Sequence, residues 1–146
     1  MKNRLVLSFV AALMMSVAIS QISLAAHAVR HHGTGSLKQT WGVDFDSGTF
    51  NTTDASTEDM DFDAVSSNHR YLEPVGNAGL TKVGAAKPSY ATCAAKSLKT
   101  TSINVKSFPV GTWFCLRTGP GHLVRFRVNS VHSDPGPVSL TYTTWK

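Results

Sequence analysis

Apolar and polar residues alternate in several short segments of this chain, which is the pattern of β-strands with one buried face. Residues 39–45, for example, place Trp41, Val43 and Phe45 on one side of a predicted strand. Further segments with strand character are residues 60–67, 70–76, 79–84, 102–108, 109–128 and 137–145. Turn-forming residues separate these segments. The pattern predicts a mainly β domain, built as a small antiparallel β-barrel or sandwich.

Residues 109–128 form the clearest predicted hairpin, because two apolar-rich segments flank Gly119, Pro120 and Gly121. Alternate residues of a strand share a face. The set expected to face the core is Phe114, Leu116, Val124, Phe126 and Val128. The opposite face carries Trp113, Cys115, Arg117, Leu123, Arg125 and Arg127. An exposed face does not normally carry a tryptophan and a cysteine, so we expect another element to cover part of it.

One segment has helical rather than strand character. In residues 87–98, Pro88 and Ser89 are suitable for a helix start, and Tyr90 and Cys93 follow at helical spacing. We therefore predict one short helix that carries Cys93. Two further segments lack periodicity: residues 29–38 are predicted to be a flexible leader, and the acidic residues 46–59 a loop.

The amino-terminal residues are typical of a secretory signal peptide, with Lys2 and Arg4 ahead of an apolar core at 5–19. The core of about 15 residues is short for a membrane span of roughly 20, although an uncleaved anchor is the alternative. A cut after Ala28 makes residues 1–28 the signal peptide, and a cut after Ala25 also fits. We expect a secreted, extracellular protein whose β-rich domain covers residues 39–146, with no membrane contact after cleavage.

The chain has two cysteines, Cys93 and Cys115. In an exported protein an even number indicates a disulfide, here Cys93–Cys115. A free thiol or a metal-binding thiolate pair is the alternative.

Charge is distributed unevenly along the chain, whose formal net charge is +5. Residues 29–69 carry seven of the nine acidic residues, whereas residues 70–146 carry ten lysines and arginines. The two halves either pack together and largely cancel, or form a basic face for an anionic polymer. Trp113, Arg117, Arg125 and Arg127 are the candidate binding surface, with an arginine stacked on the ring of Trp113. Packing with solvated charge is the structural alternative for the same residues.

Several segments have distinctive letters: "VDFDSGT" (43–49), "RYLEPVGNA" (70–78), "SYATCAAKSL" (89–98), "GTWFC" (111–115) and "LTYTTW" (140–145). With them, the chain from about Gly42 to Trp145 resembles small exported β-domains of high-GC Gram-positive and related bacteria, which occur in uncharacterised proteins. The resemblance implies a β-rich fold with a disulfide. It implies no catalytic residue.

Two metal sites are suggested by the residues. If the mature chain starts at Val29, its amine, two backbone amides and the imidazole of His31 form a square-planar set for copper. Asp44 and Asp46 are placed like the first ligands of a calcium loop, although a polar turn is the simpler interpretation. We expect no cofactor.

Catalytic motifs give weaker signals. Glu73, His122 or His132, and Arg117 or Arg125 supply the residue types of a small ribonuclease-like hydrolase, but such types are common. An exported inhibitor would use an exposed loop at 118–122 or 132–137. We favour a non-catalytic binding or structural module of the extracellular or cell-envelope space. Its expected partner is an anionic envelope polymer or a secreted protein, without specific nucleic-acid recognition.

Overall fold

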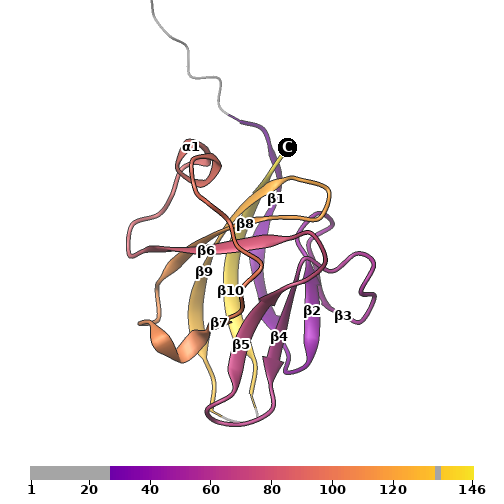
Figure 1. Ribbon diagram of the computed structural model, residues 1–146, viewed down its shortest axis with the longest axis vertical. Coiled ribbons are helices and arrows are strands. Elements are labelled where there is room, and N and C mark those ends of the chain that lie inside the picture. The colour runs from indigo at the N-terminus through magenta and orange to yellow at the C-terminus, as the bar shows by residue number, and fades with distance from the viewer. Residues whose placement is uncertain (1–26, 134–135) are drawn as a thin grey trace, which may run out of the picture.

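The computed structural model describes residues 27–133 and 136–146. They form two antiparallel sheets packed face to face, with one short helix at the end of the molecule where the carboxyl terminus lies (Figure 1). The first sheet contains β1 (Val29–Leu37), β10 (Val138–Trp145), β9 (Leu123–Val131), β8 (Trp113–Arg117) and β6 (Gly79–Gly84), in that order. The second contains β3 (Thr49–Thr52), β2 (Trp41–Asp44), β4 (Met60–Ala64), β5 (Arg70–Pro74) and β7 (Ile103–Asn104). The predicted β class is confirmed, and the architecture is a sandwich rather than a closed barrel.

The core lies between the two sheets and follows the alternation in the sequence. All five hairpin residues that were predicted to face inward are buried in it. They meet side chains of the second sheet such as Val43, Met60 and Phe62. Phe126 stacks between Phe45 and Phe114, with ring centres 5.8 and 5.1 Å away. The alternation of apolar and polar residues therefore predicted correctly which face of these strands is buried.

The prediction of a flexible leader at residues 29–38 is wrong, because Val29–Leu37 form β1 and pair with β10 along its length. Gly33 and Gly35 point inward there, where the rings of Tyr142 and Phe50 occupy the space of a side chain. A strand whose inner face is made of glycines has no apolar alternation. Its backbone pairing could not be seen in the residue pattern.

Two more predictions need correction in the neighbouring segment. Residues 46–59 are not a loop throughout, since β3 (Thr49–Thr52) forms a hairpin with β2. Trp41 is 37% exposed instead of buried with Val43, and the ammonium of Lys38 lies 5.7 Å from the centre of its ring. Trp41 is the first residue of β2.

The predicted helix is present but shorter than expected. The helix α1 spans Tyr90–Ala94, and the Ser89 side chain caps it by accepting a hydrogen bond from the Thr92 backbone N–H at 3.1 Å. The segment 102–108 contains the two-residue β7 followed by the 3-10 turn η1 (Val105–Ser107). Among residues 27–133 and 136–146, no helix is long and apolar enough to cross a membrane. The predicted signal peptide lies almost entirely outside the described residues.

Candidate functional site

Charge divides between the two sheets. Among the strands of the first sheet there is no aspartate or glutamate, and their basic residues are Arg30, Lys82, Arg117, Arg125 and Arg127. The strands of the second sheet carry Asp44, Asp61, Asp63 and Glu73, and one basic residue, the buried Arg70. Arg117, Arg125 and Arg127 lie on the outer side of the first sheet, because they alternate with core residues of the hairpin. Arg30 instead donates to the carbonyl of Asp46, and Lys82 lies over the ring of Phe108, which packs against the core. Asp61, Asp63 and Glu73 alternate with buried residues of β4 and β5 and lie on the outer side of the second sheet. The first sheet therefore presents a basic outer face.

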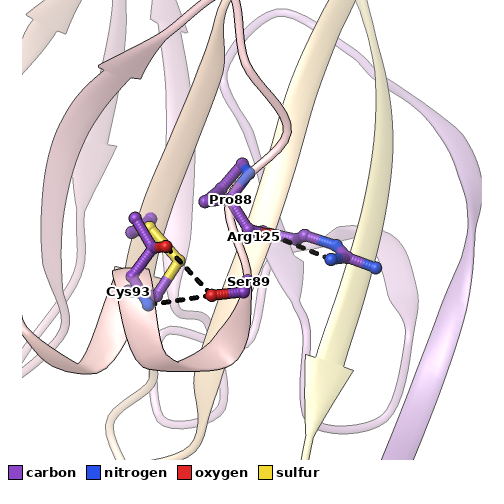
Figure 2. The surroundings of a disulfide bond; sticks show 6 residues. Pro88, Ser89, Cys93 and Arg125 are labelled. Carbon is purple, nitrogen blue, oxygen red and sulfur yellow. Dashed lines mark hydrogen bonds between the residues drawn. A yellow bond between two sulfur atoms is a disulfide. The ribbon is translucent and has the colours of Figure 1, made fainter.

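The disulfide covers one end of this face (Figure 2). Cys93 of α1 is bonded to Cys115 of β8, as predicted, and the described residues contain no free cysteine. The two buried cysteines pack with Leu123 and Trp145 in a small second core, against which Tyr90 also packs. The helix thus lies on the outer side of the hairpin. Its loop brings Lys87 and Pro88 next to the arginines of β9.

Arg125 is held rigidly beside this second core. Its guanidinium carbon lies 4.9 Å from the ring centre of Trp145, and its Nη1 donates a hydrogen bond to the Pro88 carbonyl at 2.9 Å. Figure 2 shows the other terminal nitrogen pointing away from this carbonyl. Burial lowers the pKa of Arg125, but an arginine keeps its charge at neutral pH. The side chain is a pre-positioned cation.

Trp113 supports two more cations. The guanidinium carbon of Arg127 and the ammonium of Lys87 lie 5.6 and 5.8 Å from the centre of its ring. Arg127 also donates through Nε to Asn129 at 3.0 Å. Trp113 itself is only 9% exposed, so its ring carries the cations and offers little surface to a ligand. The predicted stacking of an arginine on Trp113 is confirmed for Arg127.

A row of polar side chains continues from these arginines across the sheet. Asn129 on β9 donates to the hydroxyl of Thr141 on β10 at 2.8 Å. That hydroxyl is hydrogen-bonded at 2.9 Å to the hydroxyl of Thr34 on the edge strand β1. The outer face therefore combines fixed cations with a row of hydroxyl and amide groups.

Arg117 does not join the other candidates. It lies on the same face of β8, but four residues from Trp113, a separation of about 13 Å along a strand. Cys115, which bonds to the helix, lies between the two. The structure thus brings together Trp113, Arg125 and Arg127 and adds Lys87, whose position in the helix loop could not be inferred from residue spacing. We define the basic face by Lys87, Arg125 and Arg127 with their supporting tryptophans.

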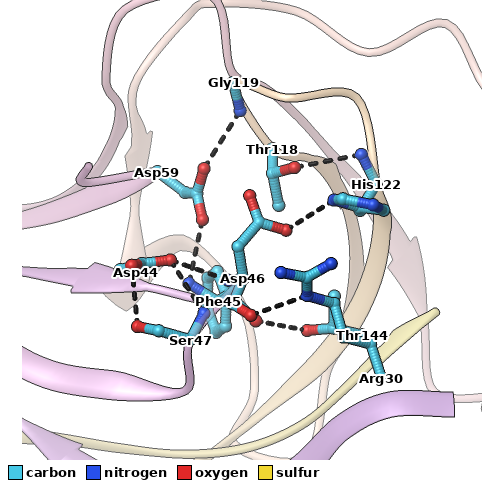
Figure 3. A network of polar contacts seen from close by, with 10 residues as sticks. All are labelled: Arg30, Asp44, Phe45, Asp46, Ser47, Asp59, Thr118, Gly119, His122 and Thr144. Atoms are coloured by element: carbon cyan, nitrogen blue, oxygen red, sulfur yellow. Dashed lines mark hydrogen bonds and ion pairs between the residues drawn. The ribbon is translucent and has the colours of Figure 1, made fainter. Parts of the chain in front are cut away.

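A second polar cluster lies where turns of the two sheets meet (Figure 3). Asp44, Asp46 and Asp59 have ligand atoms within 4.8 Å of one another. The carboxylate of Asp59 accepts hydrogen bonds from the backbone N–H groups of Phe45 at 2.8 Å and Gly119 at 3.0 Å. These bonds tie the β2–β3 turn to the β8–β9 turn. The sequence pattern contained no signal for Asp59 in this role.

The resemblance of residues 44–49 to a calcium loop has a simpler explanation. Asp44 accepts hydrogen bonds from the backbone N–H groups of Asp46 and Ser47 and from the Ser47 hydroxyl, at 2.8, 3.1 and 2.7 Å. These are the contacts of an aspartate that stabilises a turn. The alternative of a polar turn accounts for this carboxylate.

Asp59 of this cluster and the adjacent Glu58 have carboxyl groups whose pKa is raised. Burial raises the pKa of Asp59 to about 6, and the neighbouring charges of Asp46 and Asp44 add to the rise. Burial, with repulsion from Asp61, raises the pKa of Glu58 to about 7. Both carboxyl groups therefore take up protons just below neutral pH, which makes the stability of the fold depend on pH.

The glutamate and histidines of the candidate hydrolase set have separate hydrogen-bond partners. Glu73 accepts a hydrogen bond from Ser102 at 3.0 Å, whereas Nδ1 of His122 lies 2.8 Å from a carboxylate oxygen of Asp46. His132 lies 3.5 Å from the hydroxyl of Ser130.

The structure describes one of the two candidate inhibitor loops completely and the other only in part. The 118–122 turn is tied down through buried Thr118, whose hydroxyl accepts from the His122 backbone N–H at 3.0 Å. Only part of the loop at 132–137 lies within the described residues.

His31 lies on β1, on the same side as Gly33 and opposite Thr144 of β10. A copper chelate through the amine of Val29 would wrap the first three residues around the metal. The extended conformation of β1 would then be lost at its start. Copper binding at His31 stays a prediction that depends on the cut after Ala28.

Comparison with known proteins gave no match to a family model, to a curated protein or to a solved structure. The assignment of function therefore depends on the residues of this chain.

Proposed function

We propose that this protein is a non-catalytic binding module of the extracellular or cell-envelope space that holds an anionic polymer on its basic face. One observation carries the proposal. The strands of the first sheet contain no acidic residue, and two guanidinium groups are fixed in place on its outer side by indole rings. Cations that are already ordered lose little side-chain entropy when an anion binds.

The charge around this face also favours a long anionic partner. From Pro74 to Ser133 the chain has no aspartate or glutamate, while Lys96 and Lys99 follow Lys87 in the segment that crosses to β7. A surface of one sign attracts an oppositely charged polymer over a distance and raises its association rate. Mixed surface charge would not do this.

Export is part of the proposal and has two supports. The basic and apolar residues at the start of the chain are typical of a signal peptide. Disulfides such as Cys93–Cys115 persist mainly in oxidising compartments. Fractionation of the native host, followed by detection of the protein in the medium or cell wall, tests the location.

Binding can be tested by co-sedimentation of the protein with an insoluble anionic polymer at increasing salt concentration. We expect binding at low salt that weakens steeply as salt rises, because the contacts are ionic. The double variant R125A/R127A should lose at least about tenfold in affinity, which corresponds to 1.4 kcal/mol. The matched control K38A/K106A removes the same charge from outside the basic face and should bind like the unchanged protein.

Equal weakening by both double variants would show that only net charge matters and would contradict the assignment to this face. Binding of an uncharged polymer with the same affinity would contradict the electrostatic basis altogether.

A further inference from the structure

We propose that the polymer bound on the basic face is a flexible polyol phosphate, whose successive phosphate groups are taken by Arg125 and Arg127. This inference rests on the proposed function and narrows its ligand to one chemical class.

The rings of the basic face are covered. Trp113 is 9% exposed and Trp145 5% exposed, and each has a guanidinium over its ring. Single-stranded nucleic acids are held by stacking of their bases on exposed aromatic side chains. Trp41 is exposed, but it lies on β2 of the other sheet. The two tryptophans of the basic face thus offer no open ring on which a base or a sugar ring would stack. The ring of nearby Tyr90 packs edge-on against Trp145 and is itself stacked on His27.

The two arginines suit an anion that repeats along a chain. They lie two positions apart on the same face of β9, which places their backbones about 7 Å apart. Arg125 is oriented by Pro88 and Arg127 by Asn129, so both planar groups are held before binding. A guanidinium binds two oxygens of one phosphate through parallel hydrogen bonds, which an ammonium cannot do.

Neutral polar groups beside the arginines suit the polyol units between the phosphates of such a polymer. The row of Asn129, Thr141 and Thr34 leads from Arg127 to the edge of the sheet. Hydroxyl groups act both as donors and as acceptors, so they pair with the hydroxyls of a polyol. A polymer without rings can place its hydroxyls along this row.

The experiment compares poly(glycerol phosphate) with polygalacturonate and a thymidine oligonucleotide at equal charge concentration. Tryptophan fluorescence of a W41F variant reports on the face, because its remaining tryptophans are Trp113 and Trp145. We expect poly(glycerol phosphate) to bind about tenfold more tightly than the other two polymers. R125K/R127K, which keeps the charge, should lose about tenfold for the phosphate polymer, because an ammonium cannot form the two parallel hydrogen bonds of a guanidinium.

Equal affinity for all three polymers would overturn the inference while leaving the proposed function intact. Tighter binding of the oligonucleotide, or an unchanged affinity of R125K/R127K for the phosphate polymer, would also overturn it. Failure of every polymer to bind, with the W41F variant folded by circular dichroism, would refute the proposed function itself.

Discussion

Asp46 and His122 are separated by 76 positions in the chain, yet Oδ1 of Asp46 lies 2.8 Å from Nδ1 of His122. The contact joins the turn after β2 to the turn before β9, and thus the two sheets of the sandwich. Figure 3 shows that it lies next to the hydrogen bonds of Asp59. This end of the molecule is closed by polar contacts between turns.

Loss of the Asp46–His122 contact should lower the free energy of unfolding. We expect H122A to lower it by about 1 kcal/mol, because a partly buried hydrogen bond is lost. Chemical denaturation of H122A, D46A and the double variant measures the coupling between the two side chains. Additive effects of the two substitutions would show that the contact contributes nothing.

The acidic cluster predicts a protein that is more stable in mild acid than at neutral pH. The pKa of Asp59 is raised to about 6 in the folded protein, so the folded state keeps a proton that the unfolded state has released. The free energy of unfolding therefore falls as pH rises from about 4 to about 6. Glu58, with a pKa of about 7, acts in the same direction and extends the fall above pH 6.

Thermal unfolding at pH 5 and pH 7.5 tests this dependence. We expect the midpoint to be at least about 3 °C higher at pH 5. D59N should show a smaller difference, because one of the two titrating groups is gone, and E58Q should reduce the difference in the same way. A midpoint that is higher at pH 7.5 would contradict the expected sign.

The disulfide should contribute strongly to stability. Cys93 and Cys115 close a loop with a sequence separation of 22, for which chain entropy gives about 3 kcal/mol. C93A/C115A should lose roughly that amount in chemical denaturation. The unchanged protein in a reducing agent serves as a second measurement, and stability that is insensitive to both changes would contradict the prediction.

Glycine at position 35 should be essential for the packing of β1. A Cβ atom there would lie 2.5 Å from the ring of Phe50, so the strand or the ring must move. We expect G35A to lower the free energy of unfolding by about 1–3 kcal/mol. G119A is the matched control, because no atom lies within 4 Å of its added Cβ, and it should change stability by less than about 0.5 kcal/mol. Equal effects of the two substitutions would contradict this account of β1.

The sequence alone determined the elements whose side chains alternate. The β8–β9 hairpin, β4, β6 and β10 were predicted close to their observed bounds, because a period of two marks a buried face directly. The cysteine pair was also predicted, since the chain has two cysteines and so allows a single pairing within it. Alternation is a local property of each segment, and two cysteines allow a single disulfide within the chain.

Only the tertiary structure decided β1, β3 and the grouping of charged side chains. β1 is held by backbone bonds to β10 and by the space that inward glycines leave for rings, and neither leaves a periodic trace. Lys87 meets Trp113 because the disulfide draws a helix onto the sheet, and Asp59 meets Gly119 because two turns converge. Contacts between residues far apart in the chain depend on how the elements pack. The spacing of these residues in the sequence does not show which of them will meet.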